Sequence, residues 1–194
     1  WGQDFSSYQQ AGDNFWKLPG LSRMTPAEGA FYLGIPNVMI VRFGNRPVPR
    51  DFRQYALPLT PLARVVWSVV GDGSSTDNNG EPDIEPVLRL AAEFPNVTGA
   101  IMDDFFVRTR PAAPGRYTPE QIAGFRDRLC AGPRPLDLSV VVYAHDLELP
   151  IRPHLDAIDA ITFWTWRACD LAALEQNFAR LEALAPGPRK LLGI

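Results

Sequence analysis

Residues 96–106, with the sequence NVTGAIMDDFF, combine a short apolar run with two adjacent acids. The run from Val97 to Met102 is typical of a buried strand, and a Pro/Arg-rich loop follows the two phenylalanines. In a (β/α) barrel, catalytic carboxylates stand at the carboxyl ends of buried parallel strands. We therefore predict a strand over 97–103 that leads into a candidate active site at Asp103 and Asp104. The alternative is that the two acids cap a loop or bind a neighbouring arginine.

The rest of the chain repeats this pattern of strand and helix. Helices are predicted from Thr25-Pro26 to Leu33, over 83–94, from the Thr118/Gln121 capping box to about Leu129, and over 170–184. Between them lie further apolar runs at 38–43, 65–70, 138–143, 160–166 and 190–194. Because the strands are continuously apolar and alternate with helices, they are expected to be parallel and covered on both faces.

An eight-stranded barrel is the simplest completion of this order. We assign the chain to the α/β class, as a (β/α)8 TIM barrel that is incomplete at both ends, with one domain over residues 1–194. Its six strands would be strands 2 to 7, since the long opening segment is typical of a loop after a preceding strand. The alternative is an open doubly wound sheet, although no Gly-x-Gly-x-x-Gly turn marks a nucleotide site.

Composition narrows the class of function. The 194 residues are 46% hydrophobic and 21% charged, with a net charge of −3, as in an ordinary soluble domain without a basic surface for nucleic acid. No apolar run approaches the roughly 18 residues of a membrane span. Cys130 and Cys169 lack the spacing of metal ligands, so neither a metal nor a cofactor is predicted. We expect a secreted or cell-envelope location.

Ionisable and aromatic residues gather where the predicted strands end. The catalytic candidates are Asp103 and Asp104, together with Asp72 or Asp146 as a second acid; Asp4 could also supply it. Side chains alternate along a strand, so a regular strand would turn Asp103 and Asp104 to opposite faces. The sequence does not decide which face is inward. Paired carboxylates of this kind are what glycoside hydrolysis requires.

Candidate substrate-binding residues lie at the same strand ends. Trp164 and Trp166 are two positions apart and would face the same way, so at the mouth of a barrel they would form a stacking floor for sugar rings. The further candidates are Arg42, Trp67, Tyr143 and His145. The alternative for the tryptophans is that they face outward and pack against a helix.

The segment Gly99-Ala100-Ile101-Met102-Asp103-Asp104 resembles the fourth-strand signature of chitinase-like and endo-galactosaminidase-like glycoside hydrolases. The Trp-rich strand over 160–166 is similar to the sugar platforms of those barrels. The resemblance implies a hydrolase that acts on a polysaccharide or glycan. Phe105 stands where chitinase-like enzymes carry a catalytic Glu, which favours a two-aspartate mechanism. The alternatives are a non-catalytic carbohydrate-binding barrel and a structural domain of a larger extracellular protein.

Overall fold

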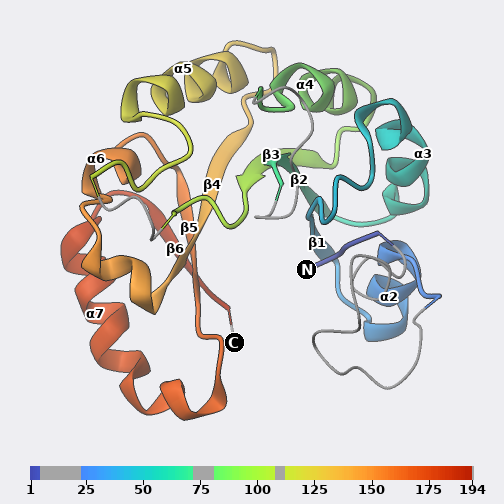
Figure 1. Ribbon diagram of the computed structural model, residues 1–194. Helices are drawn as coiled ribbons and strands as arrows, with labels where there is room; N and C mark the ends of the chain where they lie inside the picture. The colour runs from blue at the N-terminus through green and yellow to red at the C-terminus, as the bar shows by residue number, and fades with distance from the viewer. Residues whose placement is uncertain (5–22, 72–80, 108–111, 194) are drawn as a thin grey trace. The chain divides into compact units, whose positions relative to one another are not determined.

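The computed structural model describes residues 1–4, 23–71, 81–107 and 112–193 (Figure 1). The chain divides into two compact units, Trp1–Asp103 and Asp104–Ile194. In each unit parallel strands alternate with helices, which confirms the predicted α/β class.

The first unit contains three parallel strands in chain order. They are β1 (Asn37–Ile40), β2 (Arg64–Val70) and β3 (Val97–Met102). The helices are α2 (Pro26–Leu33), α3 (Phe52–Ala56) and α4 (Ile84–Glu93), with 3₁₀ turns at Pro49–Asp51 and Leu57–Leu59. Helix α2 begins at the capping box formed by Thr25 and Glu28. Helices α3 and α4 contact each other, and α4 covers β2 and β3 (Figure 1).

The packing of Trp67 identifies the helix-facing side of this sheet. Trp67 on β2 is fully buried, and its ring lies 5.1 Å from that of Phe52 on α3. Its register partner on β3, Ala100, shares this face. Because side chains alternate along a strand, Ile101 turns to the opposite face, where it pairs with Ser68. Trp67, predicted as a substrate-binding residue, is therefore part of the core.

The start of the chain adds one parallel bridge beside β1. The Gly2 N–H donates to the Met39 carbonyl at 2.7 Å, and the Gly2 carbonyl accepts from the Val41 N–H at 2.8 Å. A Cβ on Gly2 would lie 2.9 Å from the Cβ of Pro26, so this close approach of chain and helix requires glycine. The predicted opening loop falls mainly on residues 5–22, which lie outside the described residues.

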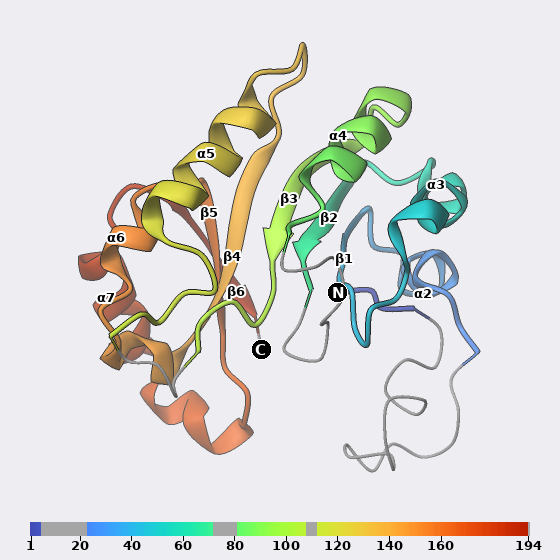
Figure 2. The ribbon, with the colours of Figure 1, turned by 45° about the horizontal axis from the view of Figure 1, so that its top comes forward.

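The second unit repeats the parallel arrangement. Its strands are β4 (Asp137–Tyr143), β5 (Ala160–Trp164) and β6 (Arg189–Gly193). Its helices are α5 (Pro119–Cys130), α6 (Arg152–Leu155) and α7 (Leu174–Leu184), with 3₁₀ helices at Ala144–Glu148 and Ala168–Ala173. The capping box of Thr118 and Gln121 that was predicted to begin α5 is present. Figure 2 shows α5 running alongside β4.

Ring packing also fixes the two faces of this second sheet. Phe163 on β5 is fully buried, and its ring lies 6.2 Å from that of Phe178 on α7. Phe163 therefore faces the helix, and its neighbour Trp164 turns to the opposite face. The register places Tyr143, Trp164 and Gly193 side by side across the three strands. This row, at the carboxyl end of each strand, forms the base of the candidate site.

The two phenylalanines that follow the acids pack against His154 in the second unit. Phe105 is fully buried, and the rings of Phe105 and Phe106 lie 6.2 and 5.9 Å from that of His154. Burial among these rings lowers the pKa of His154 below its ordinary value, because an apolar setting disfavours the imidazolium. These aromatic residues anchor the segment after Asp104 against α6.

Candidate functional site

The candidate site begins at Asp104, where the backbone leaves the direction of β3. Asp104 has a φ of 42°, in the left-handed region that few residues other than glycine adopt; aspartate and asparagine tolerate it best. The Tyr143 hydroxyl, at the end of β4, donates a hydrogen bond of 2.6 Å to Asp104 Oδ1. A phenol that donates to a carboxylate forms a strong hydrogen bond, and it fixes both side chains.

Asp146 and His145 lie directly beside this pair. Asp146 is 1% exposed, and its Oδ2 accepts a hydrogen bond of 2.9 Å from the Tyr143 N–H. Its Oδ1 lies 3.4 Å from His145 Nε2. The ring of His145 stacks on that of Tyr143, with centroids 5.3 Å apart and planes at 10°. Asp146 thus holds the start of the 3₁₀ helix through its bond to the Tyr143 N–H, so we interpret it as a positioning residue.

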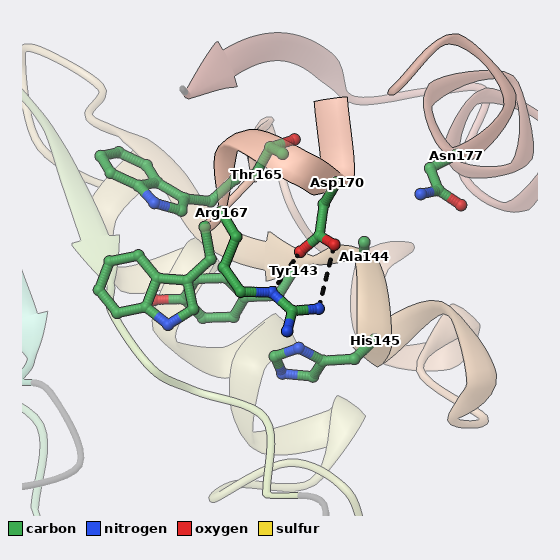
Figure 3. Close-up of a pocket in the computed structure, with 9 residues that line it drawn as sticks. Tyr143, Ala144, His145, Thr165, Arg167, Asp170 and Asn177 are labelled. Carbon is green, nitrogen blue, oxygen red and sulfur yellow. Dashed lines mark hydrogen bonds and ion pairs between the residues drawn. The ribbon is translucent and has the colours of Figure 1, made fainter. Parts of the chain in front are cut away.

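A pocket of about 520 Å³ opens over Tyr143 and His145 (Figure 3). The residues that line it come from the ends of β4 and β5, from the 3₁₀ helix Ala168–Ala173 and the residues before it, and from α7. They are Tyr143, Ala144, His145, Trp164, Thr165, Trp166, Arg167, Asp170 and Asn177. Figure 3 shows the guanidinium of Arg167 pointing toward the carboxylate of Asp170. Arg167 donates two hydrogen bonds to Asp170, of 2.9 and 3.0 Å, and these bonds lower the pKa of Asp170. The pocket therefore presents an arginine–aspartate ion pair, an imidazole and several neutral polar groups to a ligand.

Five of these residues were not among the predicted site residues: Ala144, Thr165, Arg167, Asp170 and Asn177. Arg167 and Asp170 are a charge pair three positions apart, directly after a predicted strand. In a parallel α/β sheet this is the location of binding residues, so that spacing was the signal that could have found them. Asn177 lies inside α7 and gives no comparable signal.

Both predicted tryptophans line the pocket. Trp164 lies on β5, and Trp166 follows the strand, 52% exposed, with its ring 6.2 Å from that of Tyr143. Trp164 packs directly on the backbone of Gly193. A Cβ on Gly193 would lie 2.3 Å from Trp164 Cε3, closer than any real contact. Gly193 on β6 therefore allows the indole to lie against the strand.

Replacing Gly193 with alanine is expected to displace Trp164 and reshape the pocket. The new methyl group overlaps a rigid ring, and overpacking of this kind costs about 1–3 kcal/mol of unfolding free energy. Denaturant unfolding, with tryptophan fluorescence as a second signal, measures both effects. Gly187→Ala is the matched control, since a Cβ there has no atom within 4 Å. Equal stability and equal fluorescence in the two variants would contradict this packing.

The other predicted site residues fall in the first unit or outside the described chain. The side chain of Arg42 is 1% exposed; it donates to Asp83 at 2.5 Å and to the carbonyls of Pro47 and Asn45 at 2.9 and 3.3 Å. Asp103 is 6% exposed, and its N–H donates to the Val70 carbonyl at 3.2 Å. Asp72 lies outside the described residues. The structure thus brings together Asp104, Tyr143, His145 and Asp146 with the two tryptophans.

Within the four described ranges, no helix is long and apolar enough to cross a membrane. In the same ranges, no three His, Cys, Asp or Glu side chains lie close enough together to hold a metal ion. Cys130 and Cys169 are both exposed free thiols.

Among known proteins, this chain is similar in fold to a solved structure but matches no family model and no curated protein. Among solved structures, it is similar to the crystal structure of a "putative lyase/mutase" from Burkholderia cenocepacia J2315. The TM-score is 0.50 and the identity 18%, over 86% of this chain and 71% of that chain. At this identity the likeness concerns the fold alone.

The prediction of a glycoside hydrolase is wrong by this comparison. The structural neighbour is described as a lyase/mutase, and neither the family models nor the curated proteins supply a hydrolase or glycosidase match. The resemblance rested on six residues of one strand, Gly99 to Asp104. An apolar strand that ends in acids is a property of the (β/α) architecture, which hosts many unrelated reactions, and it does not identify one of them.

Proposed function

We propose that this chain is part of an eight-stranded (β/α) barrel enzyme of the lyase or mutase kind. It would transfer protons to and from a small polar molecule bound at the carboxyl ends of β4 and β5. The alternation of parallel strands and helices in both units supports the barrel, and the likeness to the lyase/mutase structure supports the reaction class.

One observation carries this proposal: the Tyr143 hydroxyl is bonded to Asp104 at 2.6 Å while His145 stacks on the same tyrosine. Tyr143 and His145 both line the pocket. Asp104 is not among the residues that line it, and it accepts the hydrogen bond of the Tyr143 hydroxyl. The arrangement supplies two atoms that can hold a proton at the pocket wall, the Tyr143 Oη and a ring nitrogen of His145. A supporting acid stands next to each of them.

These groups match the steps that a lyase must perform. A base removes a proton from a carbon next to a carbonyl or carboxylate, and an acid protonates the leaving atom as the carbon–heteroatom bond breaks. Imidazole is the side chain whose protonation changes near neutral pH, so His145, stacked on Tyr143 at the pocket wall, is suited to be the base. Tyr143 is suited to be the acid: Asp104 fixes the phenol, whose O–H can turn to the leaving atom and give up its proton, and solvent then reprotonates the phenolate.

The test is deuterium exchange at carbon. The intact protein is incubated in D₂O with a panel of small 2-oxo-, 2-hydroxy- and 3-hydroxycarboxylates, and NMR follows loss of the C–H signal and formation of alkene. We expect exchange or elimination with at least one compound, and a loss of about 10²-fold in His145→Gln. The His145 side chain is 42% exposed, so this variant should melt with the wild type. The proposal fails if no compound exchanges or if His145→Gln exchanges at the wild-type rate.

A further inference from the structure

The pocket over Tyr143 also contains a charged group that the proposed function does not use, the guanidinium of Arg167. The Arg167 side chain is 73% exposed, and it is held by Asp170, three residues further along the chain. Its Nε donates to Asp170 Oδ2 at 2.9 Å, and its Nη2 donates to Asp170 Oδ1 at 3.0 Å. These two bonds fix the plane of the guanidinium at the pocket wall.

Asp170 engages one edge of this guanidinium. An arginine side chain has five N–H donors, and the bonds to Asp170 use two of them. The edge formed by Nη1 and Nη2 still carries two parallel N–H groups, which is the geometry that binds both oxygens of a carboxylate. In Figure 3, the part of the guanidinium that is not bonded to Asp170 points in the direction of His145. Arg167 can therefore bind a second carboxylate, one that belongs to a ligand.

Both members of the ion pair keep their charge at neutral pH. The hydrogen bonds with Asp170 raise the pKa of Arg167, and the same bonds lower the pKa of Asp170. A carboxylate at the Nη edge would lie closer to the guanidinium than to Asp170, so the attraction would exceed the repulsion. Because Arg167 is exposed, this attraction is expected to be modest.

The rest of the wall beside Arg167 is largely aromatic. Trp166 is 52% exposed, and its ring lies 6.2 Å from that of Tyr143. Trp164 lines the same pocket, and His145 stacks on Tyr143. A partly exposed indole offers a flat apolar surface on which a planar ring can stack. The volume of about 520 Å³ has room for such a ring together with a short acid chain.

We infer that Arg167 and Trp166 select an aryl-substituted carboxylate as the ligand of this pocket. Its carboxylate would accept hydrogen bonds from the Nη edge of Arg167, and its ring would stack on Trp166. The carbon chain between them would lie over Tyr143 and His145. As a statement about the substrate, this inference rests on the proposed function, and it makes Arg167 and Trp166 specificity-determining residues.

The experiment is isothermal titration of the intact protein with 3-phenylpropanoate, 3-phenylpropanamide and butanoate. The first probe has both a ring and a carboxylate, the second lacks the charge, and the third lacks the ring. We expect the first to bind at least about threefold more tightly than either of the others. Arg167→Gln should abolish the preference for the acid over the amide and leave the affinity for the amide unchanged. Trp166→Ala should weaken binding of both ring probes by at least about threefold.

Arg189→Gln is the matched control, because Arg189 forms an exposed ion pair with Asp137 and does not line the pocket. Absence of 3-phenylpropanoate binding overturns the inference, and so does equal affinity for the acid and the amide. An unchanged preference for the acid in Arg167→Gln overturns it too, as does butanoate binding as tight as that of 3-phenylpropanoate. Unchanged binding of the ring probes in Trp166→Ala has the same consequence.

The enzymatic proposal can fail independently of this inference. The three probes carry no oxo or hydroxyl group for the proposed reaction, so their binding does not depend on catalysis. Binding with the expected preferences but no proton exchange in the carboxylate panel would refute the enzymatic proposal alone. Exchange without the preference for an aryl acid would refute the inference alone.

Discussion

Tyr143→Phe is expected to lower the rate of proton exchange by about 10² or more, because it removes the hydroxyl that links the pocket to Asp104. The phenyl ring remains, so the stacking with His145 and the wall of the pocket are preserved. Binding should therefore change little while the rate falls. Comparing the rate at saturating substrate with the substrate concentration at half-maximal rate separates the two effects.

Asp104→Asn provides the second half of this experiment. Asparagine tolerates the left-handed backbone of position 104, where alanine would add strain of its own. If Asp104 acts through Tyr143, the double variant Asp104→Asn/Tyr143→Phe should lose no more activity than Tyr143→Phe alone, because residues that act as a unit are not additive. Tyr32→Phe is the matched control, since Tyr32 is 81% exposed on α2.

Losses that multiply in the double variant would show that the two residues act independently. Full activity in Tyr143→Phe would mean that the hydrogen bond is structural, and the acid would then have to be sought elsewhere. Either outcome is measured with the same exchange assay, so the comparison needs no further reagent.

The order of strands and helices could be predicted from the sequence because local signals decide it. Thr25 and Thr118 begin helices through contacts three residues away, and both capping boxes are present. The strands are apolar on both faces, which is typical of covered parallel sheets. Each predicted strand overlaps an observed one, with differences of a few residues at the ends.

The faces of the sheets could not be predicted, because a continuously apolar strand carries no alternation to read. Only the contacts of Phe163 with Phe178 and of Trp67 with Phe52 settle them. Trp164 and Trp67 are both tryptophans near strand ends, yet one lines a pocket and the other is core. That difference depends on the face of the strand that each side chain takes, because Trp67 faces α3 whereas Trp164 turns away from α7.

Several residues of the candidate site were candidates from the sequence, but the hydrogen bonds between them were not predicted. Asp104, Tyr143, His145 and Asp146 were all candidates, because they end strands. The bond between Tyr143 and Asp104 spans 39 residues and depends on the left-handed turn at Asp104, which departs from the regular strand assumed at first. The reaction class failed for a different reason, since strand-end acids are shared by barrels of many activities.

Asp83→Asn should destabilise the first unit by about 3–5 kcal/mol, the usual cost of removing one partner from a buried ion pair. The Arg42 and Asp83 side chains are 1% and 5% exposed, so Arg42 would keep its charge in the interior opposite a neutral amide. Urea unfolding at pH 7 measures the loss. The control is Glu93→Gln, which breaks the ion pair between Arg53 and Glu93. These side chains are 64% and 45% exposed, so this substitution should lower the free energy of unfolding by at most about 1 kcal/mol. Similar losses in both variants would mean that water screens the Arg42 pair as it screens the surface one. A large loss in Asp83→Asn alone would identify Arg42 as the interior anchor of the segment after β1, since its guanidinium also binds the carbonyls of Pro47 and Asn45.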